Sequence, residues 1–157
     1  MKKPALIEER SVMVTATPYL CVAGASAALD FYASAFGAEE VSRWTDRETG
    51  MIGHAEFVID GARFFLADEW PEGGVYSPAT IGRTPVSFVL EVEDVDAVFQ
   101  QAVAAGAKVE RPVADSPHGR NGWLFDPFGH RWSISAHDPG KSATDLQNEV
   151  GDEYVIT

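Results

Sequence analysis

The chain has 157 residues, 45% hydrophobic and 11% aromatic, enough to bury one core or two small halves that share a sheet. The formal net charge of −12 excludes nucleic acid and anionic membranes as favoured partners, and it either attracts cationic ligands or simply aids solubility. Cys21 is the only cysteine and no run approaches the roughly 18 apolar residues of a membrane span, so a cytoplasmic protein without disulfides or cysteine metal sites is expected.

The first half of the chain reads as a strand, a helix and three further strands, after an N-terminal arm over residues 1–13. Thr15–Val22 is rich in strand-forming residues. Ser26–Phe36 has apolar residues at helical spacing and ends before Gly37, the expected C-terminal cap. A strand over Ala38–Trp44 follows.

The clearest hairpin of the sequence lies within Met51–Asp68. Its apolar strands flank Asp60-Gly61, a dipeptide typical of a two-residue type I′ turn. Counting back from such a turn places Glu56 opposite Phe65, with His54 two residues away on the same face of the sheet.

The order of elements repeats after a linker rich in proline and glycine over residues 69–83. The predicted elements of the second half are a strand over Pro85–Val92, a helix over Val95–Ala105 capped by Gly106, and strands over Ala107–Val113, Gly122–Phe125 and His130–Ala136. The sequence therefore predicts an α+β fold of two tandem βαβββ modules, residues 14–68 and 84–137, with an acidic tail over residues 138–157.

The last predicted strand follows a turn at Asp126-Pro127-Phe128-Gly129 and has residues that alternate between two faces. Ser133 lies on one of these faces and Trp132 on the other, where we expect Trp132 to be part of the core.

Several short motifs occur in an order and spacing that resembles the vicinal oxygen chelate superfamily, also called the glyoxalase/bleomycin-resistance/dioxygenase fold. They are Leu29-Asp30-Phe31-Tyr32, Phe36-Gly37-Ala38, Gly53-His54-Ala55-Glu56, Leu66-Ala67-Asp68-Glu69, Glu93-Asp94-Val95-Asp96-Ala97, Ala104-Ala105-Gly106-Ala107 and Asp126-Pro127-Phe128-Gly129-His130-Arg131-Trp132. Three of these pieces, Gly53–Glu56, Leu66–Glu69 and Phe128–Trp132, resemble the PhnB-like branch of the superfamily. The resemblance implies a U-shaped eight-stranded mixed sheet around a cleft, with helices on the outer face. In this family a second module or a second chain completes the cleft, so a homodimer is expected.

Metal-dependent members of the family hold their ion with one residue from each of four strands. The resemblance places these positions at Thr17, Phe65, Ser87 and Ser133. None of the four carries the imidazole or carboxylate donors that divalent metals need in this geometry. We therefore expect no metal and no other cofactor.

The remaining cleft candidates combine aromatic and polar side chains. Tyr19, Phe65 and Trp123 could stack against a flat organic ligand or belong to the core. His54 and Glu56 could contact the ligand, transfer protons, or only form internal hydrogen bonds. The polar loop His118–Gly122 is either a lid over the cleft or a plain solvent-exposed loop. The expected ligand-binding residues are Thr17, Tyr19, His54, Glu56, Phe65, Ser87, Trp123 and Ser133.

Two functions follow from this reading. The first is a metal-free protein that binds a small organic molecule, cationic or aromatic, in the cleft between the modules, for sequestration or resistance as in the bleomycin-resistance members. The alternative is an isomerase, lyase or epimerase of the same fold that replaces the metal with acid–base chemistry by Glu56 and His54. A third reading is a structural or regulatory relative that binds no ligand, and the sequence does not decide among the three.

Overall fold

The computed structural model describes residues 14–157, so the predicted arm over residues 1–13 lies outside the described residues. The first module contains β1 (Tyr19–Val22), α1 (Ala25–Phe36), β2 (Glu39–Thr45), β3 (Ile52–Ile59) and β4 (Ala62–Asp68). The connecting segment contains η1 (Pro71–Gly73) and α2 (Pro78–Ile81). The second module contains β5 (Ser87–Glu91), α3 (Val95–Ala105), β6 (Lys108–Ser116), β7 (Gly119–Phe125) and β8 (Arg131–His137), and α4 (Ala143–Val150) follows.

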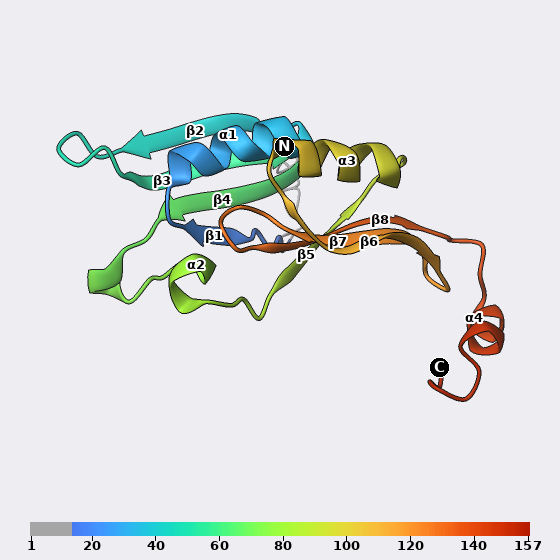
Figure 1. Cartoon of the computed structure of the whole chain (residues 1–157). Helices are drawn as coiled ribbons and strands as arrows, with labels where there is room; N and C mark the ends of the chain where they lie inside the picture. Colours follow the sequence, from blue (N-terminus) through green and yellow to red (C-terminus); the bar gives the residue numbers. More distant parts are fainter. Residues whose placement is uncertain (1–13) are drawn as a thin grey trace, which may run out of the picture.

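Hydrogen bonds divide the eight strands into two four-stranded sheets with the same topology. The strand orders are β1-β4-β3-β2 and β5-β8-β7-β6. In each sheet one edge strand pairs in parallel, β1 with β4 and β5 with β8, while the other pairs are antiparallel. The predicted α+β fold of two tandem βαβββ modules is therefore confirmed (Figure 1).

The two long helices cover the same side of the molecule and pack against each other. Figure 1 shows α1 and α3 next to one another, with the sheets beneath them. A hydrogen bond of 2.9 Å from the Gln101 side chain to the Ser34 carbonyl joins the two helices. One face of each sheet is thus covered by helices, and the opposite face, called here the open face, is not.

The predicted hairpin register is confirmed. Both turn residues have positive φ, 42° at Asp60 and 86° at Gly61, as a type I′ turn requires. The strand pairs run from Ile59–Ala62 at the turn to Glu56–Phe65 and one pair beyond. Because side chains alternate along a strand, this register places Glu56 and Phe65 on the open face of the first sheet.

Three segments differ from their predicted structure. The linker contains the short helices η1 and α2, the second of which begins with the Ser77 cap followed by Pro78. The predicted loop is wrong for residues 119–121, which belong to β7 and pair with β6 and β8, so β7 begins three residues before the predicted strand Gly122–Phe125. The tail contains α4, which starts with a capping box between Ser142 and Asp145.

A buried carboxylate links the modules through the turn before β8. Asp126 is 4% exposed, and one of its oxygens accepts hydrogen bonds from the Tyr32 hydroxyl at 2.6 Å and the Trp132 indole at 2.9 Å. The other oxygen accepts from the backbone N–H groups of Phe128 and His130. Trp132 is fully buried, as predicted, and its ring contacts Tyr32 and Phe64 of the first module. The two modules therefore share one core.

No helix within residues 14–157 has the length and apolar character that a membrane crossing needs.

Candidate functional site

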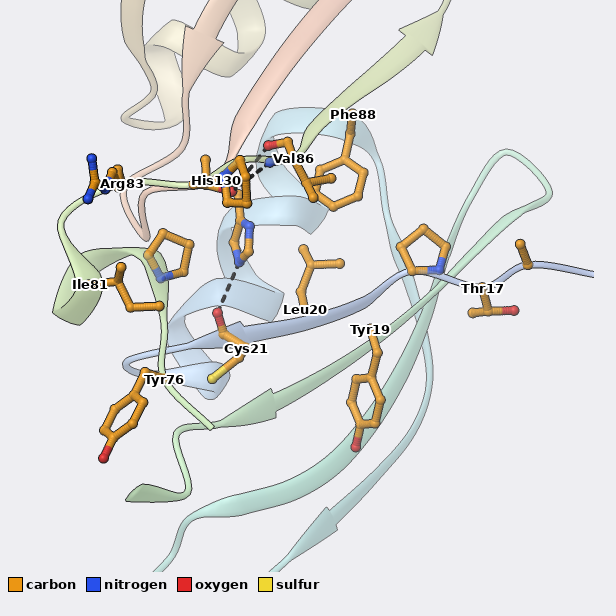
Figure 2. Close-up of a pocket in the computed structure, with 15 residues that line it drawn as sticks. Thr17, Tyr19, Leu20, Cys21, Tyr76, Ile81, Arg83, Val86, Phe88 and His130 are labelled. Atoms are coloured by element: carbon orange, nitrogen blue, oxygen red, sulfur yellow. Dashed lines mark hydrogen bonds between the residues drawn. The ribbon is translucent and has the colours of Figure 1, made fainter. Parts of the chain in front are cut away.

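A cavity of about 560 Å³ lies between the two modules. Its walls come from the segment that enters β1, from α2 and its flanks, and from the start of β5 (Figure 2). The lining includes Pro18, Leu20, Ile81, Val86 and Phe88, so most of its surface is apolar. Its size falls within the range of small-molecule sites. We call it the inter-module pocket.

His130 forms part of the wall of this pocket and is 7% exposed. Its Nε2 lies 3.0 Å from the Cys21 carbonyl oxygen, a bond drawn in Figure 2. Because a carbonyl can only accept, Nε2 carries the proton of this bond. In the neutral ring Nδ1 is then an acceptor, and this buried atom has no hydrogen-bond partner within residues 14–157.

Cys21 and Arg83 are the other reactive or charged side chains of the inter-module pocket. Burial, and then the charges of Glu69 and Asp68, raise the pKa of the Cys21 thiol. The thiol therefore stays protonated near neutral pH, which is typical of a packing residue rather than a nucleophile. Figure 2 shows Arg83 at the rim, with its exposed guanidinium directed away from His130 and Leu20.

A second cavity of about 560 Å³ lies on the first module and shares Tyr19, Leu20 and Cys21 with the inter-module pocket. Its further lining includes the apolar side chains of Met51 and Trp70. The two cavities thus meet at β1.

An aromatic cluster covers the open face of the first sheet beside these cavities. The Tyr19 hydroxyl lies 2.9 Å from His54 Nδ1. The His54 ring lies 5.0 Å from the Phe65 ring and 5.9 Å from the Trp44 ring, measured between centroids. Burial, followed by the neighbouring Cys21, raises the pKa of Tyr19, so its hydroxyl keeps its proton. Tyr19, Trp44, His54 and Phe65 are called the aromatic platform below.

Glu56 lies on the same open face but bonds elsewhere. Its carboxylate forms a 2.9 Å ion pair with Arg63, and its side chain is 16% exposed. His54 bonds to Tyr19 instead, and no bond between Glu56 and His54 occurs within the described part of the chain. The geometry therefore does not show an acid–base pair.

The open face of the second sheet is organised by Arg131. Its guanidinium lies 3.8 Å from the centre of a Trp123 ring, pairs with Glu110 at 2.8 Å and donates to the Ser87 hydroxyl at 3.0 Å. Ser133 pairs with Trp123 across β7 and β8 and is buried. Three predicted residues therefore lie near one another here, but none of them lines the inter-module pocket.

The family metal positions do not suit a metal ion. Thr17 lies just before β1 and Phe65 on β4, while Ser87 and Ser133 lie on β5 and β8. Hydroxyl and phenyl side chains supply no strong donor for a divalent ion. Within residues 14–157 no group of three or more His, Cys, Asp or Glu side chains is arranged to hold a metal.

The structure thus distributes the eight predicted site residues over the inter-module pocket, the open face of the first sheet and the open face of the second sheet. Thr17 and Tyr19 line the inter-module pocket, and Tyr19 also joins His54 and Phe65 in the aromatic platform. The sequence reasoning missed His130 and Arg83. His130 carried a signal, because it directly follows the turn at Asp126–Gly129 and begins a predicted strand, whereas nothing in the linker pattern pointed to Arg83.

Comparisons with known proteins agree with this geometry. The family model described as the Glyoxalase/Bleomycin resistance protein/Dioxygenase superfamily matches residues 12–134. The protein Mb0911c of Mycobacterium bovis is 42% identical over 122 residues, which are 75% of this chain and 80% of that protein. The structure of a PhnB protein from Bacillus cereus, titled a putative 3-demethylubiquinone-9 3-methyltransferase, is 26% identical with a TM-score of 0.59, covering 78% of this chain and 99% of that one. The fosfomycin resistance protein FosX of Listeria monocytogenes shares the fold at 18% identity, with a TM-score of 0.64 and coverage of 82% and 96%.

Proposed function

Because the chain belongs to the glyoxalase/bleomycin resistance protein/dioxygenase superfamily, we propose that it binds a small organic molecule between its two modules without a metal ion. The observation that carries the proposal is the inter-module pocket, an apolar cavity of about 560 Å³ with a few polar groups in its wall. The donor chemistry of Thr17, Phe65, Ser87 and Ser133 supports the metal-free part.

The aromatic platform extends the proposed binding surface. Tyr19 belongs both to the platform and to the pocket, so a flat ligand can contact both. Stacked or edge-on aromatic contacts add about 0.5–1.5 kcal/mol beyond the burial of apolar area. A ligand with an aromatic body is therefore favoured.

The proposed role is sequestration of such a molecule in the cytoplasm, or resistance to it. Two comparisons support this role: FosX, which shares the fold, is named a fosfomycin resistance protein, and the family name includes bleomycin resistance. Sequestration needs no reacting group, which agrees with the protonated thiol of Cys21 and the ion-paired Glu56.

Binding can be tested with 2-naphthamide, a neutral aromatic probe, by isothermal titration calorimetry. Val86→Trp places an indole in the pocket wall and is expected to weaken binding at least tenfold. Val109→Trp is the control, because Val109 is also an exposed valine, 42% against 53% for Val86, and is not part of the pocket lining. Equal binding by both variants would contradict the location of the site. A wild type that binds neither 2-naphthamide nor its charged analogue 2-naphthoate would contradict the proposal. Elemental analysis of chelator-free protein checks for bound metal, and about one divalent ion per chain would contradict the metal-free part.

The enzymatic alternative requires Glu56 and His54 to act on one substrate. Glu56→Gln separates the two functions. A general base at Glu56 would lose turnover on the order of a hundredfold or more. In a binding protein only the affinity for a cationic ligand on the aromatic platform should fall, by about 1–3 kcal/mol. Arg63→Gln is the control, because it frees Glu56 from its ion pair without removing the carboxylate.

We also propose that two copies of the chain associate through their open faces, so that the aromatic platform and a ligand bound to it are enclosed between the copies. Large apolar side chains are exposed there, with Tyr19 56%, Val89 57% and Trp44 71% exposed. Burying such residues against a second copy would remove apolar area from water. Light scattering should give twice the chain mass of 17.0 kDa at micromolar concentration, and a monomer would contradict the proposal.

A further inference from the structure

The inter-module pocket has an unusual charge for this protein. The chain carries 24 acidic and 12 basic residues, yet the described lining of the pocket includes no aspartate or glutamate and one arginine, Arg83. We infer that the ligand of this pocket is an apolar organic anion, such as an aromatic carboxylate, whose charged group pairs with Arg83. This inference rests on the proposed function and names its ligand class.

Arg83 is available for such a pair. Arg63, Arg120 and Arg131 each form an ion pair with a carboxylate of the chain. Arg83 forms none within residues 14–157, and it lies at the rim of the pocket (Figure 2). A guanidinium binds a carboxylate with two parallel hydrogen bonds, which gives both attraction and orientation.

The interior of the pocket fits the body of such a ligand. Leu20, Val86 and Phe88 offer apolar contacts beneath the rim. His130 adds a polar feature to the wall, since its Nδ1 is buried and lacks a partner in the described chain, while Nε2 is held by the Cys21 carbonyl. An ionised carboxylate has no hydrogen to donate to this acceptor, so the charged group of the ligand pairs with Arg83 and not with His130. The pocket thus combines an apolar interior with one cationic end.

The net charge of −12 does not conflict with an anionic ligand. At physiological ionic strength the field of distant surface charges is screened over about 8 Å. Arg83 acts within contact distance of the ligand, where screening is weak. The net charge lowers the encounter rate of an anion more than it changes the contact energy.

The inference is tested with 2-naphthoate and 2-naphthamide, which share a ring system and differ in charge. We expect the wild type to bind 2-naphthoate at least fivefold more tightly than 2-naphthamide in isothermal titration calorimetry at 0.15 M salt. Arg83→Gln should abolish this preference by weakening 2-naphthoate alone. Arg83→Lys, which keeps the charge without the planar fork, should retain part of it. Arg47→Gln is the matched control, since Arg47 is also an exposed arginine without an ion pair in the described chain and is not part of the pocket lining.

The outcomes separate this inference from the proposed function. Equal binding of both probes, or an unchanged preference in Arg83→Gln, would overturn the anionic ligand and leave the binding function intact. Failure of both probes to bind would overturn both. A preference lost equally in Arg47→Gln would show a general charge effect and contradict the role of Arg83. Circular dichroism of each variant confirms that it is folded.

Discussion

The two hairpin turns at equivalent places in the two modules begin with the same residue type and do different things. Asp60 opens the β3–β4 turn, is exposed and adopts a positive φ of 42°. Asp126 opens the β7–β8 turn, is buried and accepts four hydrogen bonds, one of them from Tyr32 of the other module. The first turn only reverses the chain, whereas the second also joins the modules.

This difference shows how a repeated unit acquires separate tasks. A two-residue turn has no room for a side chain to fold back under it, so the Asp60 carboxylate remains in solvent. The longer turn of residues 126–129 lets Asp126 accept bonds from two backbone N–H groups of its own turn and two side chains of the core. Four donors match the capacity of a carboxylate.

The largest effect is expected for Asp126→Asn. An amide group would turn an N–H₂ toward two of the four donors, leaving them unpaired in the core. The free energy of unfolding should fall by about 2–5 kcal/mol, measured by urea denaturation. A loss below about 0.5 kcal/mol would show that the carboxylate does not hold the modules together.

Tyr32→Phe should have the next largest effect, because it removes one donor to Asp126. The expected loss is about 1–3 kcal/mol near neutral pH. Burial, and then the charge and hydrogen bond of Asp126, raise the pKa of Tyr32 well above its usual value.

The raised pKa of Tyr32 gives this variant a pH signature. A group whose pKa is higher in the folded than in the unfolded state contributes its full stabilisation below the unfolded-state pKa, which is about 10 for tyrosine. This contribution is lost as the pH rises toward the folded-state pKa. Above about pH 10 the free energy of unfolding of the wild type should therefore fall toward that of Tyr32→Phe. The difference between the two proteins should shrink by up to about 1.4 kcal/mol per pH unit. Parallel curves for the two proteins between pH 9 and 11 would contradict this coupling.

Gly61→Ala should destabilise the chain less and for a local reason. Gly61 has a φ of 86°, and a Cβ added there would meet no other atom within 4 Å. The cost is therefore that of the backbone conformation alone, about 1–2 kcal/mol. Thermal unfolding checks it, with Gly53→Ala as the control, since Gly53 has equal space and no positive φ. Equal melting temperatures for Gly61→Ala and Gly53→Ala would argue against the type I′ turn.

The smallest effect is expected for Asp60→Asn, which is the same substitution as Asp126→Asn made at the equivalent turn of the first module. Asparagine suits the left-handed conformation at least as well as aspartate, and no core group depends on the carboxylate. The free energy of unfolding should change by less than about 0.5 kcal/mol in the same urea experiment. A loss comparable to that of Asp126→Asn would remove the contrast between the two turns.

The sequence predicted the local features of the fold well. The Asp60-Gly61 turn determined the strand register, and Gly37 and Gly106 end their helices as predicted. These features depend on residues close together in the chain, so a pattern can reveal them. The extension of β7 through Arg120 and Asn121 was missed because polar residues paired inside a sheet have no apolar alternation.

The long-range features of the site could not be predicted from the sequence pattern. Tyr32 and Asp126 are 94 residues apart, and neither shows in the sequence that the other is its partner. Arg83 reaches the rim of the pocket only because the linker passes beside β1 and β5. The predicted residues Thr17 and Tyr19 reached the same pocket, while Glu56 was placed on the correct face but with an unforeseen partner, Arg63.

The bond between Tyr32 and Asp126 also bears on how the chain tolerates a break. A protease cut in the exposed segment around Glu72 would leave two fragments that each hold half of a shared core. Because Asp126 is satisfied only when Tyr32 is present, the nicked fragments should remain bound as a complex, and the second module made alone should fold poorly. The two halves could then be supplied as separate chains and recover the structure only on mixing.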